Sequence, residues 1–207
     1  MVVILEEHSK KYYKKKRIID KYNSTSQFYD SRYKIIQEQK YEIILQKYSA
    51  NNKRILDMGC GTGLFYEYIN NSMFDNGTLL YKYVGLDISW NMLLEIKSKI
   101  LRSSLIRQFP TIIQSDIESL PLRDDTFHSI FTLTSFQNLP ELQKGIKESL
   151  RVSKNEADFK LSILRKNLVI KSLLDILKSK IKDLELIELE KLEDIIISGK
   201  ILKDKDF

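Results

Sequence analysis

Polar side chains and glycines follow four separate apolar runs of the chain, each at the point where a strand is expected to end. Because the carboxyl ends of parallel strands meet at one edge of a sheet, where ligands bind, we expect these four groups to form a single site. They are Asp57 with Gly59, Gly61 and Gly63; Asp87; Asp116; and the segment from Thr134 to Asn138.

The first group lies in RILDMGCGTGLF, which runs from Arg54 to Phe65 and is typical of a strand, a tight turn and the start of a helix. Glycines permit backbone angles that a side chain forbids, and they let a ligand approach the main chain closely. The spacing G-x-G-x-G differs from the dinucleotide pattern G-x-G-x-x-G, and no Gly-Lys-Ser/Thr follows as in a Walker loop. The stretch therefore predicts a nucleotide-type cradle of another kind.

With Asp57 in front, the pattern D-x-G-x-G-x-G resembles the first motif of the class I S-adenosylmethionine-dependent methyltransferases, in particular the type 11 group. The resemblance covers roughly residues 30–166 and implies S-adenosylmethionine as cofactor. It places Asp57 and the glycines around the methionine end of that cofactor, with Tyr29 or Tyr33 folding over it. The implied cofactor-binding residues are Asp57, Gly59, Gly61, Gly63, Asp87, Ile88, Asp116, Ile117 and Thr134.

Asp87 and Asp116 each allow a second interpretation. An acid after the second strand accepts ribose hydroxyls in nucleotide folds, and Asp87 has that position; alternatively it caps the next helix, although Ser89 is available for that role. By the resemblance, Asp116 and the amide of Ile117 hold the adenine ring. A turn-forming aspartate is the alternative for Asp116.

A sulfonium cofactor carries a good, neutral leaving group, so the reaction needs chiefly an in-line approach of the acceptor. A dedicated catalytic residue is therefore not evident, and the candidates are Ser135, Gln137 and Asn138 after the fourth expected strand. Gln137 and Asn138 could instead satisfy loop backbone. The segment lacks the Asn/Asp-Pro-Pro-Tyr/Phe of enzymes that methylate adenine or glutamine amino groups, which disfavours those substrates. His128 stands at the start of that strand and is interpreted as structural.

The expected fold class is α/β: a Rossmann-like, seven-stranded, mostly parallel sheet with one antiparallel strand and helices on both faces. The resemblance implies the strand order 3-2-1-4-5-7-6. The predicted division is a basic N-terminal extension, residues 1–29, followed by an S-adenosylmethionine-binding domain, residues 30–207. Asp30 and Ser31 are expected to cap a helix that ends at Tyr48.

The net charge of +6 is concentrated between Lys10 and Lys21, where seven basic residues face one acidic residue. Tyrosines alternate with these cations, and the cluster of Lys14, Lys15, Lys16 and Arg17 is a candidate nucleic-acid contact. A solvated terminal helix is the alternative. No helical insertion follows the third, fourth or fifth expected strand, so the acceptor pocket is expected to be shallow and open.

These features lead to the hypothesis of a methyltransferase acting on RNA, tRNA-like, or on another component of translation. The alternatives are a small-molecule methyltransferase, for a quinone or another metabolite, and a catalytically silent scaffold that binds the cofactor. Methylation of a metabolite extract would favour the small-molecule enzyme. Binding of the cofactor without any acceptor would favour the scaffold.

The segment from Thr111 to Ser115 is expected to be an exposed edge strand, which invites pairing with a partner. By resemblance to some translation-factor and tRNA methyltransferases, that partner is a small zinc-binding activator protein. One cysteine, Cys60, and two histidines leave no zinc site within the chain itself. No apolar run approaches the roughly 20 residues of a membrane span, so we expect no membrane partner and a cytoplasmic protein.

Overall fold

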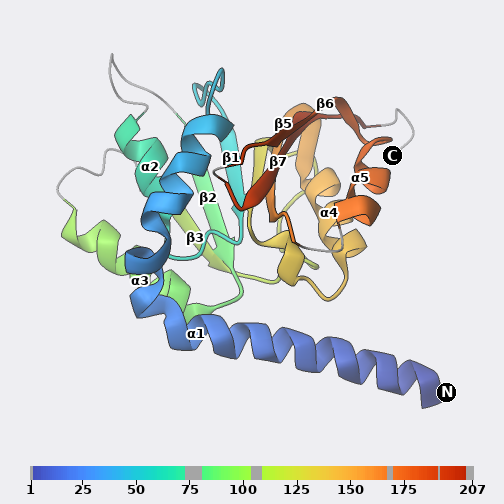
Figure 1. Ribbon diagram of the computed structural model, residues 1–207. Coiled ribbons are helices and arrows are strands. Elements are labelled where there is room, and N and C mark those ends of the chain that lie inside the picture. Colours follow the sequence, from blue (N-terminus) through green and yellow to red (C-terminus); the bar gives the residue numbers. More distant parts are fainter. Residues whose placement is uncertain (1, 73–80, 104–108, 167–169, 191, 204–207) are drawn as a thin grey trace.

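The computed structural model describes residues 2–72, 81–103, 109–166, 170–190 and 192–203 (Figure 1). Seven strands form one sheet in the order β3-β2-β1-β4-β5-β7-β6. The final strand, β7, runs antiparallel to both of its neighbours, and the other pairs are parallel. The predicted fold class and strand order are confirmed.

Strands and helices alternate along the chain, except that β3 is followed directly by β4 and that β6 and β7 form a C-terminal hairpin. The helices are α1 Val2–Ile44, α2 Leu64–Ser72, α3 Trp90–Arg102, η1 Phe136–Asn138, α4 Leu142–Val152 and α5 Ile170–Leu177. The strands are β1 Arg54–Met58, β2 Lys82–Asp87, β3 Thr111–Gln114, β4 Phe127–Leu133, β5 Ser153–Leu164, β6 Ile181–Glu188 and β7 Asp194–Ile201. β3 lies at one edge of the sheet, as predicted, and β6 at the other.

Two hydrophobic cores cover the two faces of the sheet. Helices α1, α2 and α3 pack on one face, where the rings of Tyr41, Phe65 and Phe131 stack at centroid distances of 5.0 and 4.6 Å. Helices α4 and α5 pack on the other face, with Ile146 and Leu173 against the strands. Strand β4 is buried from both sides, since side chains alternate along a strand. Both faces therefore carry helices, as expected for a mostly parallel sheet.

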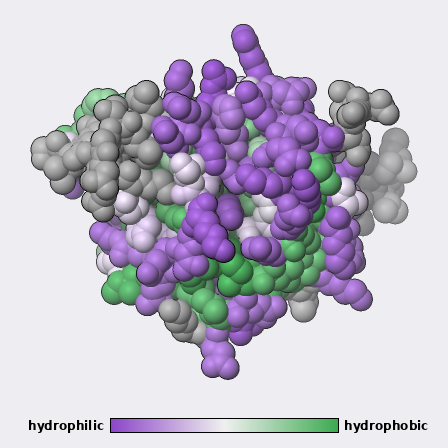
Figure 2. All heavy atoms as spheres, turned by 90° about the horizontal axis from the view of Figure 1, so that it is seen from above, coloured by the Kyte–Doolittle hydropathy of each residue, from purple (hydrophilic) through white to green (hydrophobic). Residues whose placement is uncertain are grey.

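The surface on the side away from the N-terminal part of α1 is mostly polar. Figure 1 shows this part of α1 running below the sheet, and Figure 2 views the molecule from the opposite, upper side. Hydrophilic residues cover most of that upper side, with a smaller hydrophobic area near its centre and lower part (Figure 2).

Helix α1 is continuous from Val2 to Ile44, so the expected helix start at Asp30 is wrong. Asp30 lies inside the helix, where it accepts a hydrogen bond from the Thr62 hydroxyl and pairs with Lys99. The predicted division after residue 29 falls within α1 and stays a prediction.

Helix α1 changes direction along its length (Figure 1). The hydroxyls of Ser24 and Thr25 both donate to the carbonyl oxygen of Lys21, at 2.9 Å each. Hydroxyls that bond back to the preceding turn in this way bend helices. The sequence Asn-Ser-Thr-Ser at residues 23–26 therefore accounts for the bend, and it separates a C-terminal half of α1, which packs one face on the sheet, from an N-terminal half that reaches over the strand ends.

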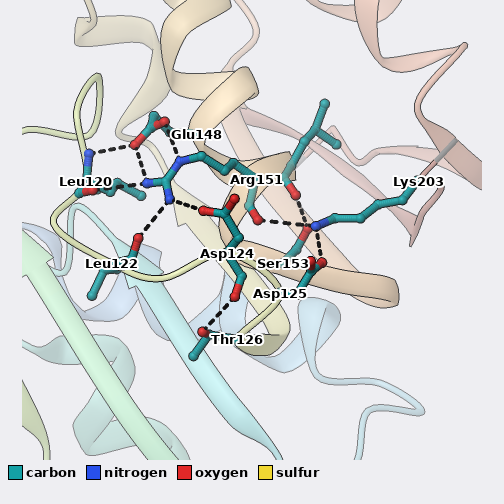
Figure 3. A network of polar contacts seen from close by, with 10 residues as sticks. Leu120, Leu122, Asp124, Asp125, Thr126, Glu148, Arg151, Ser153 and Lys203 are labelled. Atoms are coloured by element: carbon teal, nitrogen blue, oxygen red, sulfur yellow. Dashed lines mark hydrogen bonds and ion pairs between the residues drawn. The ribbon is translucent and has the colours of Figure 1, made fainter. Parts of the chain in front are cut away.

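The segment between β3 and β4 contains no helix and is held by Arg151 of α4 (Figure 3). The guanidinium donates to the carbonyl oxygens of Leu120 and Leu122, at 3.0 and 2.7 Å, and pairs with Glu148 and Asp124. Bidentate guanidinium contacts of this kind fix geometry. Arg151 thus anchors the connection whose first residues enter the site described below.

Candidate active site

A cleft opens at the carboxyl ends of β1, β2 and β4, between these strands and the N-terminal half of α1. It holds about 700 Å³ of empty space, open solvent included. Its lining residues are Lys15, Ile18, Tyr22, Tyr29, Gly59, Gly61, Asp87, Ile88, Met92, Asp116, Ile117, Leu133, Thr134, Ser135, Asn138, Leu139 and Pro140.

The four groups that the sequence predicts to meet do meet at this cleft. Of the expected cofactor residues, the lining includes Gly59, Gly61, Asp87, Ile88, Asp116, Ile117 and Thr134. Asp57 and Gly63 are not in the lining. Tyr29 lines the cleft, whereas Tyr33 packs against the ring of Tyr29 at 4.8 Å.

The three glycines of the turn have positive φ angles of 88°, 54° and 81°, and each serves a different purpose. A Cβ atom on Gly59 would stand 2.5 Å from the Cβ of Ser135, so this glycine lets the turn touch the segment after β4. A Cβ on Gly63 would meet Ile96 at 2.5 Å, so this glycine lets α2 pack on α3. At Gly61 a Cβ would meet no atom within 4 Å. Gly61 therefore faces open space, as a cradle for a ligand requires.

Asp87 is held by backbone amides at the end of β2. Its two carboxylate oxygens accept from the amides of Gly61, at 3.0 Å, and Ser89, at 2.8 Å. The Ser89 hydroxyl accepts from the amide of Met92 and caps α3, so Asp87 is not needed as the helix cap. Burial raises the pKa of Asp87, against the lowering effect of these amide hydrogen bonds. Its remaining lone pairs are available to hydroxyl donors in the cleft.

Asp57 is buried behind the turn, on the face of the sheet that carries Tyr83. The Tyr83 hydroxyl donates to the Asp57 carboxylate. Burial raises the pKa of Asp57 to about 7, with the Tyr83 hydrogen bond opposing the rise and the charge of Asp87 adding to it. The motif suggested that Asp57 contacts the cofactor. The side of the strand to which Asp57 points is set by the alternation of side chains along β1, however, and the motif carries no information on that alternation.

The segment after β4 divides its three catalytic candidates. Ser135 and Asn138 line the cleft. The Ser135 hydroxyl donates to the Met58 carbonyl oxygen at 2.7 Å, which ties this segment to the glycine turn. The Gln137 side chain accepts from the amide of Leu164 at 2.8 Å and lies outside the lining. Gln137 thus accepts a hydrogen bond from a backbone amide, which is the alternative given above to a role in catalysis.

The N-terminal half of α1 covers the cleft through one face of the helix. The ammonium of Lys15 lies against the carboxylates of Asp116 and Glu118, the latter at 2.7 Å, and Asn138 donates to the Tyr22 hydroxyl at 3.0 Å. In the described part of the chain, β3 is followed by β4 with no helix between them, and β4 is followed by η1 and the crossover helix α4. The expectation of an open pocket nevertheless has to be corrected, because α1 provides the cover.

The cover was missed although a signal for it was present in the sequence. Lys11, Lys15, Ile18 and Tyr22 recur at steps of four, three and four residues, which is the spacing of one helix face. Lys11 pairs with Glu141 at 3.1 Å, and Lys14 donates to the Leu139 carbonyl oxygen at 2.7 Å. This helix face was overlooked because it lies within a run of basic residues, and a cation in such a run is normally solvated.

Two further predictions concern residues away from the cleft. His128 accepts a hydrogen bond from the amide of Arg54 at 3.1 Å, at the start of β1, in agreement with a structural role. Among the described residues, no group of three or more His, Cys, Asp or Glu side chains has the arrangement of a metal site. Within the same residues, no helix combines the length and the apolar character of a membrane span.

Residues 56–159, half of the chain, match the protein family described as "Methyltransferase domain". The chain belongs to this family. Two relatives of this methyltransferase domain have curated names. A malonyl-acyl-carrier-protein O-methyltransferase of Buchnera aphidicola is 30% identical over 144 residues, which are 68% of this chain and 51% of the relative. A ubiquinone/menaquinone biosynthesis C-methyltransferase of Wigglesworthia glossinidia brevipalpis is 31% identical over 150 residues, 70% of this chain and 58% of the relative.

A solved structure supports the fold of the methyltransferase domain. The putative S-adenosyl-L-methionine-dependent methyltransferase of Methanococcus maripaludis superposes with a TM-score of 0.73 at 16% identity, over 89% of this chain and 95% of that one. The methyltransferase domain spans between half and three fifths of the length of the two curated relatives. Its cofactor, as in this family, is S-adenosylmethionine.

The residues of the cleft fit that cofactor. S-Adenosylmethionine offers two ribose hydroxyls, an adenine ring and a charged amino acid end. The methyltransferase domain presents a half-buried carboxylate on Asp87, an open backbone cradle at Gly61, and an apolar wall that includes Ile88, Met92 and Ile117. A nucleoside needs this combination of hydroxyl acceptor, close backbone approach and apolar contact with the ring.

The raised pKa of Asp57 makes the stability of the domain depend on pH. Folding favours the protonated carboxyl because the pKa rises from its ordinary 3.8 to about 7. The associated stability is complete below about pH 4 and is lost as the pH rises through 7. We expect Asp57→Asn to remove this slope, a difference on the order of a few kcal/mol in the free energy of unfolding between pH 4 and 8. Urea titrations of both proteins measure it, and parallel pH profiles would contradict the assignment.

Proposed function

We propose that this chain transfers the methyl group of S-adenosylmethionine to a small-molecule acceptor. One observation carries the proposal: α1 closes the acceptor side of the cleft with apolar and aromatic side chains. Ile18 and Tyr22 of α1 and Leu139 and Pro140 after η1 belong to one lining. A mostly apolar cleft with a few placed polar groups is the usual form of a small-molecule site.

The cofactor site proposed here consists of the glycine turn, Asp87 with Ile88, and Asp116 with Ile117. Asp87 accepts the ribose hydroxyls, the turn approaches the amino acid end at Gly61, and Ile117 contacts the adenine. When bound, the cofactor supplies an electrophilic methyl group on a sulfonium. The chain then has to hold the acceptor in line and exclude water, and Tyr22 and Asn138, joined by a 3.0 Å hydrogen bond, are placed to do so.

Lys15 pairs with Asp116, a carboxylate of this proposed site, so Lys15 and the cofactor compete for the same group. Its ammonium contacts both Asp116 and Glu118, so Glu118 can keep the cation when Asp116 turns to the adenine amino group. During such an exchange the carboxylate of Glu118, whose side chain is 5% exposed, stays paired with Lys15.

The names of the two relatives support a small acceptor over RNA. One is named for quinone biosynthesis and the other for a malonyl group on a carrier protein. Neither name refers to RNA, so the small-molecule alternative now takes precedence over the RNA hypothesis. A catalytically silent scaffold remains the outcome to be tested against activity.

The basic cluster of α1 separates these hypotheses, because only part of it faces the cleft. Lys16 and Arg17 are exposed on the outer side of the helix, whereas Lys15 lines the cleft. We expect Lys16→Glu/Arg17→Glu to leave methyl transfer to the small acceptor within about twofold of the wild type, since exposed charges act weakly at a distance. The matched variant Lys15→Glu should lower the rate about tenfold or more, because a third carboxylate joins Asp116 and Glu118. A loss of turnover in the outward-facing variant alone would favour a polyanionic acceptor.

The acceptor class is tested with S-adenosylmethionine that carries a tritiated methyl group. The chain is incubated separately with a solvent extract of metabolites and lipids, with total RNA and with a protein fraction. We expect label in the extract, and digestion and chromatography then identify the methylated compound. Label confined to RNA or protein would contradict the small-molecule proposal, and no label in any fraction would favour a scaffold.

A partner protein at the edge strand β3 stays a proposal. Thr111 and Gln114 are exposed on this edge, and Ile112 and Ile113 are half-buried. Backbone groups on a free edge of a sheet are open to pairing, which is the mode expected for a small zinc-binding activator. Co-expression of such a protein with this chain and recovery of a stable complex would support it, whereas full activity of the isolated chain would count against it.

A further inference from the structure

A buried lysine lies behind the cleft wall, on the half of α1 that packs into the core. The side chain of Lys40 is 2% exposed and that of Asp194, at the start of β7, is 3% exposed. The ammonium donates to the Asp194 carboxylate and to the hydroxyl of Thr134, at 2.6 Å each. Any two of these three residues are separated by 60 to 154 positions in the sequence, so the fold alone brings them together.

Thr134 is the point at which this buried pair meets the cleft. It has a φ angle of 59°, in the left-handed region that β-branched residues avoid. Its hydroxyl donates to Asp194 at 3.0 Å while accepting from Lys40, and its amide donates to the Ser162 carbonyl oxygen at 2.9 Å. A residue persists in a strained conformation when its surroundings over-determine it, and here the buried ion pair does so.

The bend at Thr134 sets the position of the next residue against the glycine turn. Ser135 donates to the Met58 carbonyl oxygen, and its Cβ atom occupies the space that a side chain on Gly59 would need. The glycine turn and the segment after β4 therefore keep their contact only while Thr134 keeps its left-handed backbone conformation. Both walls belong to the cleft described above.

We propose that Lys40, together with Asp194, is a positioning residue that holds the bend at Thr134 and so keeps the cofactor cleft in shape. This inference rests on the proposed cofactor site. Lys40 does not line the cleft, and its ammonium is engaged by Asp194 and Thr134, so it acts on the reaction only through the backbone of residues 134 and 135. Its contribution is to cofactor affinity, beyond any contribution to folding.

The test replaces the ion pair by apolar side chains, Lys40→Met/Asp194→Leu, so that no buried charge is left unpaired. Affinity for S-adenosylhomocysteine is measured by calorimetry and folding by thermal unfolding. We expect a double variant that folds and binds about tenfold or more weakly, since the Thr134 hydroxyl loses Lys40 and Asp194 and keeps only the Ser162 hydroxyl, at 3.3 Å. Adding Thr134→Gly should restore most of the affinity, because glycine adopts a φ of 59° without strain. A role in global stability alone predicts no such recovery.

A second ion pair gives the matched control. Lys53 and Asp158 pair at 2.7 Å, with side chains 25% and 12% exposed, Asp158 also pairs with the 41% exposed Lys200 at 2.6 Å, and none of the three lines the cleft. Lys53→Met/Asp158→Leu should therefore leave the affinity unchanged. Should the first double variant not fold, Thr134→Val keeps the Lys40–Asp194 pair and removes only the hydroxyl, and we expect it to weaken binding with little change in the unfolding temperature.

The outcomes separate this inference from the proposed function. No binding by the wild-type chain would reject the cofactor site and the role of Lys40 with it. Binding by the wild type with equal affinity in Lys40→Met/Asp194→Leu, or in Thr134→Val, would reject the positioning role alone. A failure of Thr134→Gly to restore affinity in the folded double variant would likewise overturn it.

Discussion

Replacing Asp87 by asparagine should lower the affinity for S-adenosylmethionine by about 100-fold, or ~3 kcal/mol, since a hydrogen bond to a charged group contributes roughly 1.5–3 kcal/mol and two hydroxyls are involved. The variant keeps the shape of the side chain but loses its charge. It also turns one amide group toward the donors of Gly61 and Ser89, which now lie at 3.0 and 2.8 Å from the carboxylate. Calorimetric titration with S-adenosylmethionine measures the loss.

Asp125→Asn is the control for this experiment. Asp125 lies outside the cleft, its side chain is 66% exposed, and its φ of 49° suits asparagine as well as aspartate. We expect wild-type affinity in this variant. If Asp87→Asn also bound the cofactor like the wild type while remaining folded, the ribose contact would be wrong.

Valine in place of Gly61 should weaken cofactor binding by about tenfold or more while the protein still folds. A Cβ atom at this position meets no protein atom within 4 Å, so the main cost to the folded state is the conformational cost of a positive φ, about 1–2 kcal/mol. The added atoms fill the cradle instead, and overpacking at a close contact costs about 1–3 kcal/mol. Binding and thermal unfolding measured on the same sample separate the two effects.

Gly63→Ala supplies the opposite profile. Its Cβ would meet Ile96 at 2.5 Å in the packing of α2 on α3, outside the cleft lining. We expect a clear loss of stability and a smaller loss of affinity in the molecules that fold. Equal affinity of Gly61→Val and the wild type would show that the cofactor does not approach the turn.

The parts of the site that sequence alone predicted are those with a local signal. The glycine turn, Asp87 and Asp116 each stand directly after an apolar strand, and the order of the strands in the sheet is the one that the family resemblance implies. A parallel sheet then brings the strand ends together, whatever the details of packing. For this reason seven of the nine expected cofactor residues line one cleft.

The parts that it could not predict depend on contacts between distant residues. Lys15 pairs with Asp116, which is 101 positions away in the sequence, and Lys40 pairs with Asp194, which is 154 positions away. Neither pair lies within a single sequence motif. The charge run around Lys15 is typical of a solvated helix, although one of its faces covers the cleft. Asp57 shows a different limit, because its motif gives its place in the chain but not the side of the strand on which it points.

We expect the cleft between the glycine turn and α1 to bind a sulfonium nucleoside. Titration of the wild-type chain with S-adenosylhomocysteine in a calorimeter is the decisive measurement, because that product analogue carries the same adenosine and amino acid groups. We expect saturable binding with one site per chain, competed by S-adenosylmethionine. No heat of binding over the whole accessible concentration range, from a chain that is shown to be folded, would contradict it.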